Sequence, residues 1–196
     1  MKVIDWMSFK GHVTIYKILP DKSREIVVDK DNLVVYTGRE WVLSRIFNIN
    51  NSNITPTKDY AINWISFGSG GAPTSDPFNP TPPESTDTSI TEITVDANDS
   101  NLYQGKKIPL QKTEYSTTLE FQKDSSMDNK YLMLVVSCLL NENQANDELI
   151  NEAALWISNT NVATTANSFT MFSHVTFPTF KKTSNFKYLI NWIIHS

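Results

Sequence analysis

The sequence has one cysteine, few charged residues and few glycines, and the first two shortages exclude whole classes of protein. A single thiol, Cys138, allows no intramolecular disulfide and no zinc site built from cysteines. Charged residues make up 19% of the chain, and the 21 acidic side chains outnumber the 17 basic ones. Because nucleic-acid binding depends on a basic surface, we expect no direct binding of nucleic acid.

Long apolar runs are also missing. The longest, residues 131–140, is about half of the roughly 20 residues that a membrane-spanning helix needs. Asp5 and Ser8 interrupt the first residues of the chain, where a signal peptide would be continuously apolar. We therefore expect no membrane segment, and folding in a reducing cytoplasm.

What the sequence does contain is strand periodicity. Runs rich in β-branched residues at 11–19 and 24–29 flank a proline-containing turn and predict a hairpin. Apolar and polar residues alternate over 115–122, whereas 131–138 is apolar on both faces, as is typical of a central strand. Further strands are expected at 32–36, 60–67, 152–157, 169–177 and 187–195, although 151–155 would also suit a short helix.

One helix is expected, at about residues 38–48. Apolar residues recur there at helical spacing, beginning with Trp41 and Val42, and Thr37 is a plausible N-cap. The chain of 196 residues suits a single domain, residues 1–196. We predict an all-β fold, a β-sandwich of roughly eight or more antiparallel strands with this one short helix and a long proline-rich loop.

That loop is an arm at about residues 68–89. Three of the six glycines lie within 68–71, and five of the nine prolines lie within 72–89. Such a segment disfavours helix and interior strand, so we expect an extended arm that leaves the domain at a glycine hinge and contacts neighbouring proteins. The residues expected to make these contacts are Gly68, Gly70, Gly71, Pro73, Asp76, Phe78, Pro80, Pro82 and Pro83.

No segment carries a complete catalytic, cofactor or metal motif. The glycines at 68–71 follow a strand as a phosphate loop does, but no Lys-Ser/Thr pair and no helix follows them. Residues 96–100 begin like a calcium loop, yet Asn101 and Lys107 stand where its glycine and glutamate are needed. We therefore expect no cofactor, no metal and no catalytic residue.

Single residues with reactive side chains are better explained as structural. Ser137 and Cys138 lie in an apolar strand without the glycine-flanked turn that exposes a hydrolase serine. The three histidines, His12, His174 and His195, have no metal-binding spacing, although a metal site assembled in three dimensions stays open.

Several short motifs occur in a fixed order over residues 11–195. They are DNLVVYTG (31–38), INWISFGSG (62–70) running into APTSD (72–76), INEAALW (150–156), FSHVTFPTFKKT (172–183) and LINWII (189–194). This order resembles a pattern in virion structural proteins of tailed bacteriophages, with Ala153-Ala154 in place of Ile/Val-Gly and His174 in place of the commoner Arg. A composition rich in Asn, Lys, Ile and Thr fits the AT-rich genomes of their crAss-like relatives.

The resemblance implies a noncatalytic building block of the virion, one copy among many in a ring at the neck or tail. Its partners would be copies of itself and other virion proteins, such as portal, neck or tail components. The chain would fold in the host cytoplasm and end in the particle.

Two other classes of function remain open. One is a module of a tail fibre or collar appendage that binds a host glycan or receptor through exposed aromatic rings. The loops at 48–57 and 72–89 contain Phe78 as their only aromatic residue, and Trp64 and Trp192 lie in apolar strands that we expect in the core. The other is an enzyme such as a glycan depolymerase, which needs converging carboxylates that the sequence does not single out.

Overall fold

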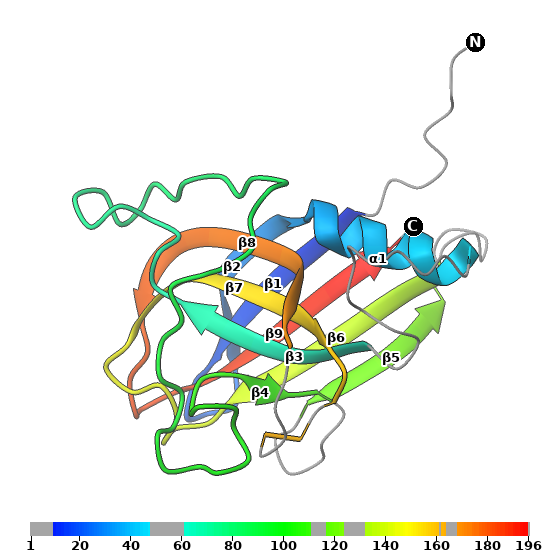
Figure 1. Ribbon diagram of the computed structural model, residues 1–196. Helices are drawn as coiled ribbons and strands as arrows, with labels where there is room; N and C mark the ends of the chain where they lie inside the picture. Colours follow the sequence, from blue (N-terminus) through cyan, green and yellow to red (C-terminus); the bar gives the residue numbers. More distant parts are fainter. Residues whose placement is uncertain are drawn as a thin grey trace.

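The computed structural model describes residues 10–47, 61–110, 117–123, 132–160, 162–163 and 168–195, and the predicted loop at 48–57 lies outside them. The elements in chain order are β1 (Lys10–Ile18), β2 (Arg24–Val34), α1 (Tyr36–Phe47), β3 (Ala61–Gly68), β4 (Ile108–Pro109), β5 (Thr118–Lys123), β6 (Leu132–Leu140), β7 (Leu149–Ser158), β8 (Thr170–Lys181) and β9 (Lys187–His195). Figure 1 shows strands on both sides of the molecule and α1 along one edge.

The strands form one nine-stranded antiparallel sheet in the order β4-β3-β7-β8-β2-β1-β9-β6-β5. Strand β2 pairs with β1 along most of its length and with β8 at its end, through Leu33 and Val34. The sheet curls at this strand, so that its two halves face one another (Figure 1). The all-β prediction is confirmed, and the two layers of the predicted sandwich are halves of a single curled sheet.

Both halves bury their inner side chains in one apolar core. Ile15 and Trp192 come from β1 and β9, and Phe67 and Phe177 come from β3 and β8; all four are at most 1% exposed. Trp64 is fully buried in a neighbouring cluster, so the prediction that Trp64 and Trp192 are core residues is confirmed. Burial of these apolar side chains is the main stabilising contribution to such a fold.

The helix α1 begins at Tyr36, two residues before the predicted start. Thr37 is therefore not an N-cap residue: it lies in the first turn, where its hydroxyl donates a hydrogen bond of 2.6 Å to the carbonyl of Met171 on β8. The Trp41 ring meets Phe172 of the same strand edge-on at 6.1 Å. These contacts dock α1 on β8. Among the described residues, no helix has the length and apolar character needed to cross a membrane.

Strand β8 continues through Pro178, four residues past the predicted end at Phe177. The pairing with β7 is irregular there, since Ile150 lies opposite Phe180 but Glu152 lies opposite Thr176. An irregular pairing of this kind tolerates a proline, because the missing N–H is not needed for the regular ladder. This break in the register frees backbone groups of β8 for other partners.

Three further findings concern the strands β2, β7 and β4. The predicted pieces at 24–29 and 32–36 belong to one strand, β2, because the chain keeps pairing with β1 as far as Asn32. The strand expected at 152–157 is confirmed as part of β7, and the alternative helix at 151–155 is absent. The two-residue strand β4, which pairs with β3, was not predicted.

Candidate functional site on the proline-rich arm

The arm (68–89) leaves and returns at the same end of β3. Gly68 and Glu92 form an antiparallel bridge, and the Ser69 N–H donates to the Thr91 carbonyl at 2.9 Å. The Ile93 N–H donates to the carbonyl of Phe67 at 3.0 Å. The arm is therefore a closed loop with both ends fixed on the sheet, and Figure 1 shows it extending past β8.

Between these ends the arm runs along β8 in the opposite direction. The Thr179 N–H, next to Pro178 in the irregular stretch, donates to the Pro77 carbonyl at 2.8 Å. The Thr176 hydroxyl donates to the Thr81 carbonyl at 2.7 Å. The arm thus has a defined path over the strand, fixed by atoms of β8 that the pairing with β7 leaves free.

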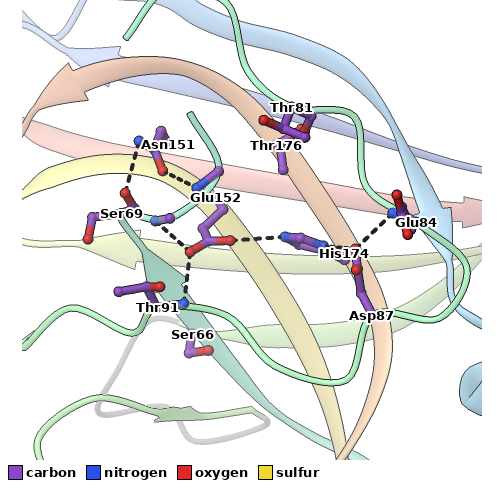
Figure 2. Close-up of polar contacts among 12 residues, drawn as sticks. Ser66, Ser69, Thr81, Glu84, Asp87, Thr91, Asn151, Glu152, His174 and Thr176 are labelled. Carbon is purple, nitrogen blue, oxygen red and sulfur yellow. Dashed lines mark hydrogen bonds and ion pairs between the residues drawn. The ribbon is translucent and has the colours of Figure 1, made fainter. Parts of the chain in front are cut away.

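A buried histidine joins the arm to two strands. The Nδ1 atom of His174 lies 2.8 Å from Oδ2 of Asp87, which belongs to the arm, and its Nε2 atom lies 3.2 Å from Oε2 of Glu152 on β7 (Figure 2). An ionised carboxylate only accepts hydrogen bonds, so both contacts form when each ring nitrogen carries a proton and donates a hydrogen bond. This arrangement fits the imidazolium form of His174.

The same two carboxylates bind backbone N–H groups of the arm and its return. Glu152 Oε1 accepts from Gly70 at 2.7 Å and from Thr91 at 2.9 Å, so one buried side chain ties the outgoing and returning chain together. Asp87 Oδ2 accepts from the Glu84 N–H at 2.8 Å. Charge-assisted hydrogen bonds of this kind are among the stronger ones in proteins.

Two opposing effects act on the pKa of His174. Burial lowers it, because desolvation disfavours the charged ring, whereas the hydrogen bonds with Glu152 and Asp87 raise it. The carboxylates outweigh burial, and the pKa of His174 lies above its ordinary value. The charged ring is thus the form that fits the cluster, and we name His174, Glu152 and Asp87 the arm latch.

Asn151 provides a second attachment, at the irregular stretch of β7. Its Oδ1 atom accepts from the Gly71 N–H at 2.7 Å, and its Nδ2 group donates to the Ser69 carbonyl at 3.2 Å (Figure 2). The Nδ2 group also donates to Oγ1 of Thr179 at 3.1 Å. The side chain is 4% exposed. One amide therefore bonds the arm on one side and β8 on the other.

The glycines at the start of the arm are closely packed against neighbouring atoms. The sequence had suggested a hinge at this point. A Cβ atom on Gly71 would lie 2.4 Å from the carbonyl oxygen of Asn151. On Gly68 it would lie 2.5 Å from Oε1 of Glu152, and on Gly70 2.6 Å from Oγ1 of Thr91. Glycine is needed here because the backbone approaches its partners closely.

The remaining residues expected to make contacts lie at different depths. Pro73, Asp76, Phe78 and Pro82 are exposed, whereas Pro80 and Pro83 are half-buried. Phe78 is 75% exposed, the largest exposed fraction among the exposed large hydrophobic side chains of the described residues. Phe78 belongs to a small closed loop, since the Thr81 N–H donates to the Gly71 carbonyl at 2.9 Å. These exposed positions are available to a protein partner.

A polar pocket of about 320 Å³ lies between the arm and the sheet, beside the latch. Its wall includes the three latch residues together with Ser89 and Thr91. General-base catalysis would need a histidine nitrogen directed at a substrate or nucleophile. Both nitrogens of His174 bind carboxylates, and these contacts join the arm to β7 and β8.

The other candidate residues lie apart from the latch. Burial raises the pKa of the Cys138 thiol to about 12, and the hydroxyl of Ser137 donates to Asn191. His12 lies on β1, with its ring nitrogens 2.8 Å from Asp29 and 2.9 Å from Asp31. Within the described ranges, no three His, Cys, Asp or Glu side chains are grouped so that they could hold a metal ion.

Sequence reasoning did not identify the latch. Its signal was an ionisable residue inside a largely apolar strand: Glu152 directly precedes Ala153-Ala154-Leu155, and His174 directly precedes Val175. A buried ionisable group needs a partner, so each of these residues indicated a hidden contact. Comparison with family models, with curated proteins and with solved structures finds no match for this chain.

Proposed function

We propose that the protein is a noncatalytic structural component of a tailed-phage virion. It assembles into a ring at the neck or tail, through contacts with its own copies and with other virion proteins. One structural observation carries this proposal: the arm is fixed to the sheet by buried side chains while its outer residues, above all Phe78, remain exposed. The order of motifs that resembles virion structural proteins supports it independently.

A fixed arm is suited to binding another protein. The latch and Asn151 restrict the arm before any partner arrives, and five prolines restrict it further. Less conformational entropy is then lost on association, so more of the contact energy contributes to affinity. An arm ordered in advance is therefore a binding feature with a defined shape.

The composition of the surface favours the same role. Charged residues are 19% of the chain, below the usual share of about 25%. A subunit in a ring is covered on several sides, and each buried charge must be desolvated. Neutral polar groups can form hydrogen bonds across an interface at a lower desolvation cost. A surface of this kind suits repeated contacts between copies.

Analysis of purified phage particles tests the proposal. We expect peptides of this chain in particles purified by density gradient, at a copy number of several per particle. Particles that contain the other tail proteins but lack this chain would contradict it. A host-cell lysate from the same infection provides the control, because it shows that the chain was expressed.

A further inference from the structure

Strand β2 has one paired edge and one open edge. It pairs with β1 over residues 24–32, but β8 covers its other edge only at Leu33 and Val34. Along residues 24–31, the described part of the chain forms no backbone hydrogen bond with β2 except from β1. Unpaired N–H and C=O groups on a strand edge readily pair with a strand of another chain. An extended segment can therefore bind at this open edge of β2.

Side chains along the open edge are exposed and carry charges of both signs. Residues 24–31 read REIVVDKD, and all except the two central valines are exposed. Ile26 is 57% exposed. Neither Arg24 nor Lys30 forms an ion pair with a described residue. The edge thus presents an exposed apolar side chain and two cations that can bind carboxylates of a partner.

Two acidic side chains of the edge can accept further hydrogen bonds. Asp31 is 93% exposed and meets His12 through Oδ1, so its second oxygen can accept from another donor. Glu25 is 59% exposed, and its Oε2 atom lies 3.7 Å from Nζ of Lys17, which is longer than a hydrogen bond. Each carboxylate can therefore bind a cation from a partner.

These charges select one way of pairing the edge with its own copy. Antiparallel pairing centred on residues 27–28 places Arg24 opposite Asp31 of the second copy. It also places Glu25 opposite Lys30, and each of these contacts occurs twice. A shift of one residue in one direction brings Arg24 opposite Lys30. A shift in the other direction brings Glu25 opposite Asp31. Parallel pairing in register sets each charge against itself, so only the centred antiparallel register avoids these repulsions.

A β-bulge gives the strand the geometry that this register needs. Residues opposite each other in an antiparallel pair direct their backbone groups alike, and along a regular strand this direction alternates from residue to residue. Arg24 and Asp31 are an odd number of positions apart, so a regular strand would direct them differently. In β2 the extra residue Val27, which has no partner in β1, restores the match. Arg24 lies opposite Ile18 of β1. Asp31 lies opposite His12, an even number of positions along β1, so both residues are directed alike.

We infer that β2 binds β2 of a second copy of the chain, antiparallel and in the register centred on residues 27–28. A two-fold axis relates the two strands, so the same residues make the same contacts in both directions. Opposite charges face each other on both sides of the valines, and the added strand partly covers Ile26. The self-complementary charge pattern identifies a second copy, in place of an unrelated strand, as the occupant.

This strand pairing goes beyond the proposed function and does not rest on it. A two-fold contact is complete with two copies, so it is additional to the contacts that close a ring. The two can fail separately. Particles can contain the chain without this pairing, and the purified chain can form it whether or not the chain enters particles.

Exchange of charges tests the pairing. Arg24→Glu places an acid opposite Asp31 of the second copy, and Asp31→Arg places a cation opposite Arg24. We expect each variant alone to dimerise at least about tenfold more weakly than the wild-type chain in sedimentation. An equimolar mixture restores the opposite-charge contacts, so it should regain dimerisation and give one-to-one heterodimers in native mass spectrometry. A mixture that associates no better than either variant alone would overturn the inference.

His12→Gln is the control for Asp31→Arg. It removes the same hydrogen bond between His12 and Asp31 but leaves the charges of residues 24–31 intact. We expect this variant to dimerise like the wild-type chain. A loss as large as that of Asp31→Arg would assign the effect to the fold of the hairpin and overturn the inference.

Disulfide trapping tests the register. Residues 26 and 29 lie opposite each other in the inferred pairing, within reach of a disulfide. A mixture of Ile26→Cys and Asp29→Cys should therefore form a disulfide-linked heterodimer on mild oxidation, much faster than Ile26→Cys links to itself. The native Cys138 does not compete, because it is buried and burial raises its pKa to about 12.

Two further outcomes would contradict the pairing. One is equal linking of Ile26→Cys with itself and with Asp29→Cys, which would exclude the register. The other is a wild-type chain that stays monomeric at every concentration in sedimentation. Unfolding curves show whether each variant folds, and if Asp31→Arg does not, the cysteine pair decides.

Discussion

The Nε2 atom of His174 on β8 lies 3.2 Å from Oε2 of Glu152 on the neighbouring strand β7. Glu152 is 3% exposed and binds both ends of the arm, while the other ring nitrogen of His174 binds Asp87 within the arm. This buried ion pair on the sheet therefore holds the arm at its start, at its return and, through Asp87, within its length.

Replacing His174 with glutamine should loosen the arm and destabilise the protein. Glutamine removes the positive charge, so Glu152 and Asp87 are left without a cation between them. We expect a loss of about 2–4 kcal/mol in the free energy of unfolding, below the full cost of breaking a buried pair because Asp87 is 28% exposed. Urea unfolding measures the loss, and limited proteolysis should show earlier cleavage within residues 69–91.

His12→Gln is the matched control for that variant. His12 also lies between two carboxylates, Asp29 and Asp31, but on an exposed part of β1 and β2. Exposed ion pairs contribute little to stability, so His12→Gln should change the free energy of unfolding much less and leave the arm resistant to proteolysis. Equal effects of the two substitutions would contradict the role assigned to the latch.

The stability of the protein should fall as the pH rises above 6.5. Burial lowers the pKa of His174, but Glu152 and Asp87 raise it more, so the folded-state value lies above the ordinary 6.5. A raised pKa means that the folded state holds the proton more tightly. Its stabilising effect is complete below pH 6.5 and is lost as the pH rises through the folded-state value.

Urea unfolding at a series of pH values from 6.5 upward measures this dependence. Because the pKa of His12 is also raised, by its hydrogen bonds with Asp31 and Asp29, His174→Gln should reduce the slope and the double variant with His12→Gln should remove most of it. A slope that is the same in His174→Gln and in the wild-type chain would refute the linkage.

Gly71→Ala should disturb the start of the arm. The added Cβ would lie 2.4 Å from the carbonyl oxygen of Asn151, a backbone atom in β7 that cannot move without shifting the strand. We expect a loss of about 1–3 kcal/mol, as for other overpacked sites. Ser69→Ala, an exposed position that keeps its backbone hydrogen bonds, should stay within about 0.5 kcal/mol of the wild type in the same unfolding experiment.

Lys107 and Glu92 should behave as a coupled pair. The Lys107 ammonium bonds to Glu92 and lies 4.6 Å from the ring centroid of Trp156 and 4.8 Å from that of Phe169. Lys107→Met leaves Glu92 without its cation and should cost about 2–4 kcal/mol. The double variant with Glu92→Met leaves no unpaired charge and should recover much of that loss. If the double variant loses as much stability as Lys107→Met and Glu92→Met lose separately when added together, the two residues are not coupled.

The strands were predictable where the signal is local. The β-branched run at 11–19 and the doubly apolar run at 131–138 are local signals, and the structure has the strands β1 (Lys10–Ile18) and β6 (Leu132–Leu140) there. Strand β4 was missed because its two residues gain their conformation only by pairing with β3, more than forty residues earlier. The end of β8 was misplaced because Pro178 was taken to stop a strand.

The candidate site was predictable in part. Glycine and proline located the arm, since these residues restrict the backbone in ways that a sequence shows. Its attachment was not predictable, because His174, Glu152 and Asp87 are brought together from separate parts of the chain. No spacing rule connects them. The conflict between an ionisable residue and an apolar strand was the one available signal.

A cryo-EM reconstruction of the intact phage particle tests the central claim most directly. The account predicts density for this chain as a closed ring of copies at the neck or tail, with the arm lying along β8 and Phe78 buried against another protein chain. A map of a complete neck and tail in which every protein is assigned and this chain has no place would contradict it.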